Sequence, residues 1–143
     1  MFVAKRFKWE AAHRIPWHSG KCKNLHGHSY KMDVELEGEI DAQGIVVDFH
    51  DIKHIINPIV DQLDHSTIIS EKDSELLEVF KAKNWKYFLV PFDSTAENLC
   101  DYFLKLIVDD NRDFLTEKKI TKIGIRMYET DTAYAYKCIT IGS

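Results

Sequence analysis

Two stretches near the N-terminus alternate between apolar and polar residues, which is the pattern of a half-buried β-strand. In residues 7–14, one side of the predicted strand carries Phe7, Trp9, Ala11 and His13. In residues 26–37, one side carries His26, His28, Tyr30, Met32, Val34 and Leu36. Both strands therefore direct histidines toward the same side as their core residues.

A helical period replaces this alternation after the turn residues of segment 37–46. Asp48 is predicted to be the N-cap of a helix over residues 48–63, with Asp51 at position N3. The apolar stripe of this helix consists of Ile52, Ile55, Ile56, Ile59 and Leu63. Pro58 removes a backbone donor inside the pattern, so we expect a kink or a break there.

A second helix is predicted where Ser94 and Glu97 have the spacing of a capping box. Its apolar residues follow at spacings of three and four: Leu99, Cys100, Phe103, Leu106 and Ile107. Two strands then end the sequence, and the second is the aromatic and β-branched run 133–141. One face of the first carries Thr121, Ile123, Ile125, Met127 and Glu129. A carboxylate thus ends an otherwise apolar series.

The predicted order is strand, strand, helix, helix, strand, strand, which favours an α+β fold. We expect a single domain over residues 1–143, with a four-stranded antiparallel sheet and two main helices on one of its faces. The pattern in residues 66–93 is weaker. There we expect a short helix near residues 75–82 and a long loop.

Composition excludes several classes of protein. The chain is 45% hydrophobic and 29% charged, and none of its apolar stretches is long enough to span a membrane. A net charge of −4 without a long basic run disfavours binding to nucleic acid. The N-terminus lacks the pattern of a secretory signal, and three cysteines argue against a disulfide framework. We therefore expect a cytoplasmic protein with reduced thiols.

The histidines of the two N-terminal strands have metal-ligand spacing. His26 and His28 are two residues apart on one strand, so both can reach the same ion, and His13 on the preceding strand could supply a third ligand. Each alone is more often an ordinary core or rim residue, but three on one face favour a metal site. His50 and His54 have helical i, i+4 spacing, yet they lie opposite the isoleucine stripe and are predicted to be solvated.

Cys22 leaves two kinds of zinc site open. If its thiolate is the fourth ligand, the site is closed and structural, whereas a thiolate beside the metal leaves room for water or substrate. The chain has a hydrophobic pattern of its own and does not need zinc to fold, which weakens the structural interpretation. A thiol beside a cation also has a lowered pKa, which suits proton transfer. Cys100 and Cys138 are predicted to be small core residues.

Two acidic positions also allow two interpretations. Asp64 and His65 follow the first helix, where such a pair is more often a helix-end feature than a proton relay. Glu129 could be exposed at a strand end. Alternatively, its carboxylate could accept two parallel hydrogen bonds from arginine or from a guanine or pterin ring.

Six segments together resemble a known family: FKWEAAHRI, GKCKNLHGHSY, GIVVDFHDIK, QLDHSTI, STAENL and YET. Apart from residues 66–93, they cover nearly the whole chain and are similar to the 6-pyruvoyl-tetrahydropterin synthase family of the tunnelling-fold superfamily. The spacing from Cys22 to His26 and the sequence VVDF most closely resemble its 6-carboxy-tetrahydropterin synthase branch, which belongs to queuosine biosynthesis. The segment 128–131 resembles the pyruvoyl branch as much as the carboxy branch.

The resemblance implies a role for each of these groups. The ligands of a Zn²⁺ cofactor would be His13, His26 and His28. The catalytic residues would be Cys22 as proton acceptor, a relay of Asp64 and His65, and Glu129. The residues that bind the pterin would be Glu129 and Thr95.

The implied substrate is 7,8-dihydroneopterin triphosphate. In the carboxy branch it yields 6-carboxy-5,6,7,8-tetrahydropterin, acetaldehyde and triphosphate, whereas the alternatives are a 6-pyruvoyl product or a non-catalytic domain with a structural Cys/His₃ zinc site. Arg14, Lys21 and Lys23 could meet the triphosphate or be solvated surface charges. The resemblance also implies a homo-oligomer of trimers stacked into hexamers. Four strands cannot close a barrel alone, so assembly would remove open sheet edges.

Overall fold

The two N-terminal strands form the longest pairing in the structure. In the computed structural model, which describes residues 1–142, β1 (Phe2–His13) and β2 (His26–Glu37) are antiparallel along their whole length. The predicted inward face of β1 is buried from Phe7 to His13, and the inward face of β2 is buried from Tyr30 to Leu36. The predicted faces of both strands are therefore confirmed.

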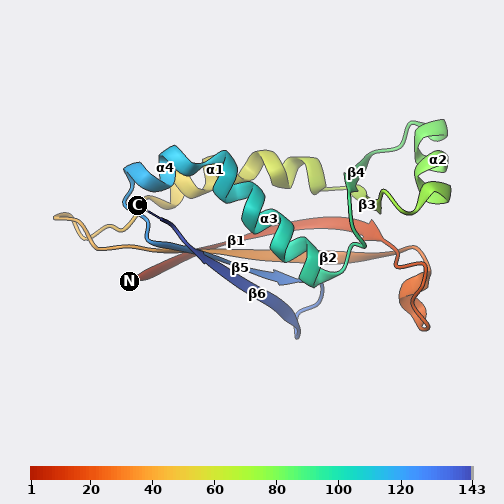
Figure 1. Cartoon of the computed structure of the whole chain (residues 1–143), viewed down its shortest axis with the longest axis horizontal. Coiled ribbons are helices and arrows are strands. Elements are labelled where there is room, and N and C mark those ends of the chain that lie inside the picture. The colour runs from red at the N-terminus through yellow and green to blue at the C-terminus, as the bar shows by residue number, and fades with distance from the viewer. Residues whose placement is uncertain (143) are drawn as a thin grey trace.

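Six strands form one mixed sheet in the order β4-β3-β1-β2-β5-β6, as Figure 1 shows in part. β5 (Lys122–Tyr128) and β6 (Tyr134–Thr140) continue the antiparallel sheet beyond β2. On the other side of β1, β3 (Ser66–Ser70) and β4 (Tyr87–Val90) are added in parallel pairings. The prediction of a four-stranded antiparallel sheet is therefore wrong, whereas the α+β class is confirmed.

Segment 66–93 holds the two unpredicted strands. The expected short helix is present as α2 (Ser74–Lys83), but the expected long loop is wrong because β3 and β4 flank that helix. All five residues of β3 are buried. A strand buried on both faces shows no alternation, which is why the pattern did not reveal it. The short helix α4 (Arg112–Glu117) was also not predicted.

Helix α1 (Phe49–Leu63) begins where the pattern predicts. The side chain of Asp48 accepts a hydrogen bond from the backbone N–H of His50, which confirms the cap. The helix continues through Pro58, so a break there is wrong. Residues on both sides of the proline are buried against the sheet, and this packing holds both halves of the helix in place: Ile52, Ile56, Ile59 and Leu63.

Helix α3 (Ala96–Asp110) begins one residue later than a capping box at Ser94 would require. Its N-cap is Thr95, whose Oγ1 accepts a hydrogen bond from the N–H of Asn98 at 3.2 Å. The predicted capping box is therefore wrong. The hydroxyl of Ser94 instead lies 3.1 Å from Nδ1 of His13, so a tertiary contact replaces the local one.

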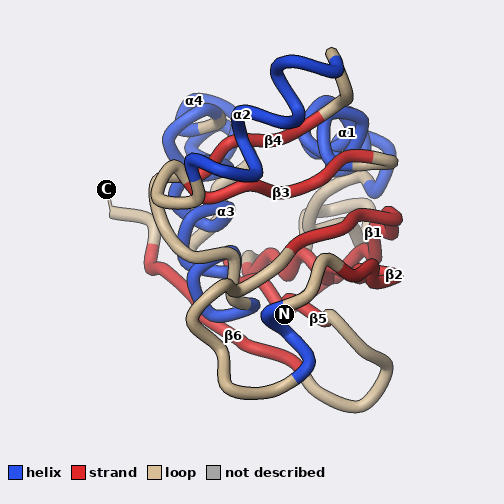
Figure 2. The backbone as a smooth tube through the Cα atoms, turned by 90° about the vertical axis from the view of Figure 1, so that its right-hand side faces the viewer, coloured by secondary structure: helices blue, strands red, loops and turns tan. Residues whose placement is uncertain are grey.

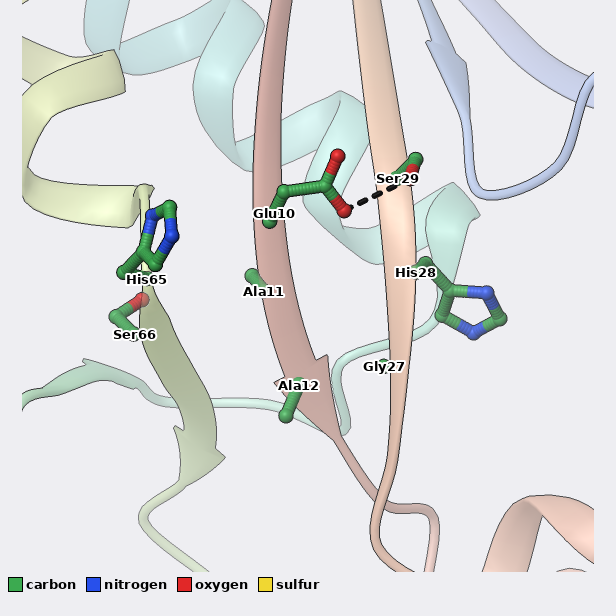
Figure 3. A pocket seen from close by; sticks show the side chains of 8 residues that line it. All are labelled: Glu10, Ala11, Ala12, Gly27, His28, Ser29, His65 and Ser66. Carbon is green, nitrogen blue, oxygen red and sulfur yellow. Dashed lines mark hydrogen bonds between the residues drawn. The ribbon is translucent and has the colours of Figure 1, made fainter.

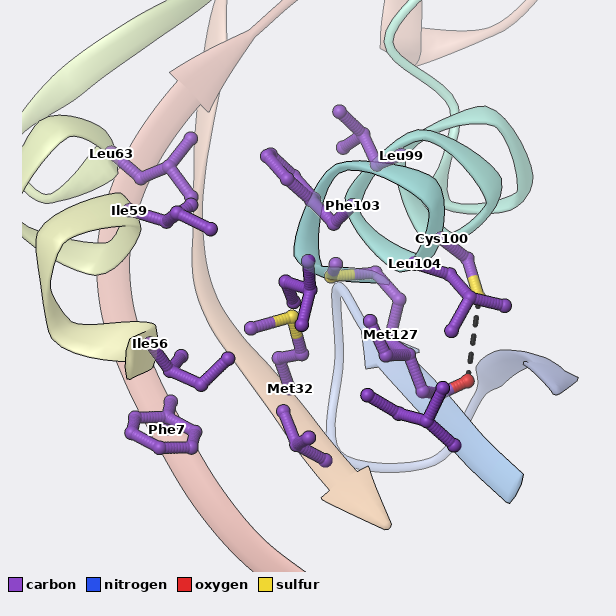
Figure 4. Packing of buried hydrophobic residues seen from close by; sticks show 14 of the residues in the cluster. Phe7, Met32, Ile56, Ile59, Leu63, Leu99, Cys100, Phe103, Leu104 and Met127 are labelled. Atoms are coloured by element: carbon purple, nitrogen blue, oxygen red, sulfur yellow. Dashed lines mark hydrogen bonds between the residues drawn. The ribbon is translucent and has the colours of Figure 1, made fainter. Parts of the chain in front are cut away.

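The core lies between the sheet and helices α1 and α3, which Figure 2 shows on one side of β1, β2, β5 and β6. Figure 4 shows residues of α1 and α3 meeting Met32 and Met127 of the sheet. Cys100 belongs to this core, and its Sγ donates to the carbonyl of Ile125 at 3.3 Å. Cys138 on β6 is only half-buried. Among residues 1–142, no helix combines the length and the apolar character that crossing a bilayer requires.

Candidate functional site

Three histidines converge where β1 ends and β2 begins. One ring nitrogen each of His13, His26 and His28 lies within 4.8 Å of the other two. This follows from the strand register, because His13 pairs with His26 and the side chain of His28 points the same way as that of His26. Neutral imidazoles at this separation are a donor set that suits zinc. The three residues could therefore hold one metal ion.

Backbone carbonyls orient two of the three rings. Nδ1 of His13 lies 2.8 Å from the carbonyl oxygen of Ser94, and Nδ1 of His26 lies 2.7 Å from that of Asn24. A carbonyl only accepts, so each Nδ1 must carry the proton and each Nε2 keeps its lone pair. Nε2 of His13 in turn lies 3.1 Å from Nε2 of His28. Two ring nitrogens this close share a proton or face one cation. The carbonyls that accept from Nδ1 of His13 and His26 are typical partners of metal-binding histidines.

The environment favours neutral imidazoles. Burial lowers the pKa of His13 to about 4, and burial followed by the nearby His26 ring also lowers the pKa of His28. Desolvation disfavours the charged form of a histidine. At neutral pH the nitrogens of these two residues are therefore available to a metal without the loss of a proton.

Glu129 lies beside the histidine cluster, just beyond the end of β5. Its two carboxylate oxygens are 3.9 Å from Nε2 of His13 and 4.0 Å from Nε2 of His28. Its side chain is 27% exposed, so Glu129 is half-buried, and the alternative of a Glu exposed at a strand end is wrong. Burial, followed by the charge of Glu97, raises the pKa of this carboxyl. A cavity of about 240 Å³ adjoins it and is lined by Ala96, Glu97, Glu129, Thr130, Ala133 and Tyr134.

Cys22 is close in sequence to the histidines but is not one of the clustered donors. It lies on a short 3₁₀ helix, Lys21–Lys23, in the loop between β1 and β2, and its thiol is free and half-buried. Its carbonyl accepts from the N–H of Ile15 at 2.8 Å, which ties the two sides of the loop together. Within residues 1–142, the set of donors that could share one ion contains the three histidines and not this sulfur.

Asp64 and His65 lie at the junction of α1 and β3. Nδ1 of His65 is 3.0 Å from Oδ2 of Asp64, while Oδ1 of Asp64 accepts from the N–H of Glu10 at 2.9 Å. The hydrogen bond from Glu10, followed by that from His65, lowers the pKa of Asp64. Figure 3 shows His65 on the β3 side of β1 and His28 beyond β2, around a groove of about 360 Å³. The structure thus pairs Asp64 with His65, but on the other side of β1 from His28.

The other basic residues and histidines considered from the sequence are either bound to another residue or exposed. Arg14 follows His13 directly, but its guanidinium donates two hydrogen bonds of 2.7 Å to Asp73. Lys21 and Lys23 are exposed. The side chains of His50 and His54 are also exposed, which confirms that they are solvated.

Sequence reasoning missed Ser94 and Asn24 as partners of the histidines. Both act through backbone carbonyls, which every residue type possesses, so the sequence carries no signal for them. Ser94 is 1% exposed. The hydroxyl of Ser94 also contacts His13, but its position just before a helix predicts a cap, so the local pattern gives no indication of this contact.

Comparison with known sequences points to one family. A family model described as 6-pyruvoyl tetrahydropterin synthase matches residues 2–137. The 6-carboxy-5,6,7,8-tetrahydropterin synthase of Haemophilus influenzae is 33% identical over 140 residues, which cover 92% of this chain and 94% of the relative. A protein of the same name from Aquifex aeolicus is 31% identical, with 93% of this chain and 94% of the relative covered.

Solved structures agree on the fold. The 6-pyruvoyl tetrahydropterin synthase of Plasmodium falciparum superposes with a TM-score of 0.77 at 21% identity, covering 99% of this chain and 98% of that chain. The enzyme of that name from Caenorhabditis elegans gives a TM-score of 0.63 at 24% identity, covering 100% and 96% of the two chains. The expected tunnelling fold is thus shared with these proteins. With the match of the family model over nearly the whole length, we conclude that the chain belongs to the 6-pyruvoyl tetrahydropterin synthase family.

Proposed function

We propose that the protein is a zinc-dependent lyase that makes 6-carboxy-5,6,7,8-tetrahydropterin. Its substrates would be 7,8-dihydroneopterin triphosphate and one water, and its other products acetaldehyde and triphosphate. The observation that carries the proposal is the convergence of His13, His26 and His28 beside the carboxylate of Glu129. The relatives that bear the name of this synthase support the choice of product.

The three histidines would hold the zinc through their Nε2 atoms, since a carbonyl occupies Nδ1 in two of them. When bound, zinc supplies a Lewis acid that makes nearby C–H and O–H groups of a substrate more acidic. Three protein ligands leave a coordination position free, which is the pattern of catalytic rather than structural zinc sites. The absence of Cys22 from the donor set argues against the structural Cys/His₃ alternative.

Cys22 would act as the general base. A thiolate is a stronger base than a thiol. Cys22 lies in the loop that joins β1 to β2, and these two strands carry the three histidines at their loop ends. The thiolate would accept a proton from a side-chain carbon of the substrate.

Glu129 and Thr95 would bind the pterin, and Asp64 with His65 would move protons. The carboxylate of Glu129 can accept two parallel hydrogen bonds from the amino-pyrimidine edge of the ring. His65 has Nδ1 at Asp64 and presents Nε2 to the solvent, as a proton shuttle requires. The exit of triphosphate breaks a C–O bond, and the release of acetaldehyde breaks a C–C bond.

Product analysis with the zinc-loaded protein tests this proposal. Incubation with dihydroneopterin triphosphate should yield 6-carboxy-tetrahydropterin by mass and one acetaldehyde for each triphosphate released. A 6-pyruvoyl product without acetaldehyde would instead identify the other branch of the family.

Cys22→Ala tests the base directly. This variant should lose turnover by at least about 100-fold, in the range of general base catalysis, while it retains zinc. Cys138→Ala, which removes another half-buried thiol, is the matched control and should remain active. Normal turnover of Cys22→Ala would refute the role of this thiol, and loss of zinc from it would favour the structural alternative.

A further inference from the structure

Lys86, in the segment between α2 and β4, binds the C-terminal end of α1. Its Nζ donates to the carbonyl of Asp64 at 2.6 Å and to the carbonyl of Asp61 at 2.9 Å. The last carbonyls of a helix have no partner within the helix, and a lysine ammonium also complements the negative end of the helix dipole. Lys86 thus caps α1 from a part of the chain more than twenty residues away in sequence.

The residue that follows this contact has a strained backbone. His65 has a φ of 57°, in the left-handed region that a residue with a β-carbon seldom adopts. Such strain persists only where the surroundings hold it. Here the N–H of His65 donates to the carbonyl of Glu10 at 2.6 Å.

These contacts hold one peptide unit at both ends. The unit that joins Asp64 to His65 is bound through its N–H by β1 and through its C=O by Lys86. The carboxylate of Asp64 is fixed separately by the N–H of Glu10. The orientation of this peptide determines the direction in which the side chain of His65 points. It therefore determines whether Nδ1 of His65 can reach the carboxylate of Asp64.

We propose that Lys86 is a positioning residue that keeps the Asp64–His65 peptide in its strained conformation and so holds the His65 imidazole on the Asp64 carboxylate. The use of this pair in proton transfer rests on the proposed function, but the positioning itself does not. Segment 66–93 then contributes to the candidate site, because its residue Lys86 supplies the amine that binds the carbonyl of Asp64.

The first test follows the tautomer of His65 by ¹⁵N NMR of the zinc-loaded protein. The wild type should show His65 protonated on Nδ1, because that nitrogen faces a carboxylate. Lys86→Met should shift His65 toward the Nε2-protonated form that predominates in free solution. Lys83→Met removes an exposed lysine from the same segment and should leave the His65 signals unchanged. Lys86→Arg keeps the donor and should restore the wild-type signals.

The second test measures turnover of the same variants. Lys86→Met should lower kcat about tenfold with little change in KM or zinc content, because a misplaced proton shuttle affects the chemical step rather than binding. Thermal unfolding establishes that each variant is folded, and should Lys86→Met not fold, Lys86→Gln, which removes the ammonium, takes its place with the same expected result. Wild-type His65 signals in folded Lys86→Met would overturn the proposal. If the wild type itself releases no triphosphate, the proposed function fails, while the NMR result still decides the role of Lys86.

Discussion

At the residue scale, the candidate site depends on which nitrogen of each imidazole is free. Carbonyls of Ser94 and Asn24 occupy Nδ1 of His13 and His26, and both Nε2 atoms are thereby left for a ligand. No carbonyl of residues 1–142 binds His28 in this way, but its Nε2 lies 3.1 Å from that of His13. The candidate metal site is therefore pre-organised by groups that would not be ligands themselves.

Removal of one clustered histidine should abolish tight zinc binding. We expect His26→Ala to weaken zinc affinity by more than about 100-fold, since outer partners alone typically contribute about 10- to 100-fold. Competition with a chromophoric chelator measures this change. His54→Ala, in the exposed helical pair, is the matched control and should bind zinc like the wild type. Equal affinities for the two variants would show that the cluster is not the zinc site.

At the element scale, segment 66–93 stabilises the end of β1 that carries His13. Asp73 precedes α2, and it both accepts the two hydrogen bonds from Arg14 and caps the helix through the N–H of Leu76. Arg14 follows His13, so this ion pair secures the strand next to a candidate ligand. The parallel strand β3 was not predictable from alternation, because a fully buried strand has none. Its neighbour β4 has only four residues, which is too short for a clear pattern.

The ion pair makes stability depend on pH in a defined direction. Arg14 lowers the pKa of Asp73 below its ordinary value. A carboxyl with a lowered folded-state pKa contributes stability above its unfolded pKa of about 4, and this contribution is lost as pH falls through the folded value. Asp73→Asn, which can still cap the helix, should therefore cost about 2 kcal/mol at neutral pH, as for hydrogen bonds to charged groups.

Urea unfolding of both proteins measures this difference. The difference in free energy of unfolding between wild type and Asp73→Asn should become smaller as the pH is lowered below about 4. Asp101→Asn removes a carboxylate that pairs with the exposed lysines Lys105 and Lys137, and it should cost less at neutral pH. A difference in free energy of unfolding that stays constant from neutral to acidic pH would contradict a stabilising ion pair between Arg14 and Asp73.

At the scale of the whole molecule, two strands have long edges without a paired strand among residues 1–142. β3 pairs with β1 only at Ala11 and Ala12, so most of the outer edge of β1 is open, and β6 is a terminal strand of the sheet. Open edges of this length favour pairing with another chain. The protein is therefore expected to assemble with other copies, and the family resemblance implies a trimer or hexamer.

Light scattering coupled to gel filtration tests this expectation. The measured mass should be three or six times the 16.7 kDa of one chain, at protein concentrations where the enzyme is active. An active monomer would contradict it, and would place the complete site within a single chain.

The sequence by itself determined the local features of this protein. Alternation assigned the faces of β1 and β2, and a capping aspartate located the start of α1, because side-chain direction and helix ends depend on neighbouring residues. Only the tertiary structure decided that Glu129 and the carbonyl of Ser94 lie at the His13 ring and that Lys86 reaches Asp64. These contacts join residues 22 to 116 positions apart in sequence, and such contacts are determined by how strands pair and helices pack rather than by any local pattern.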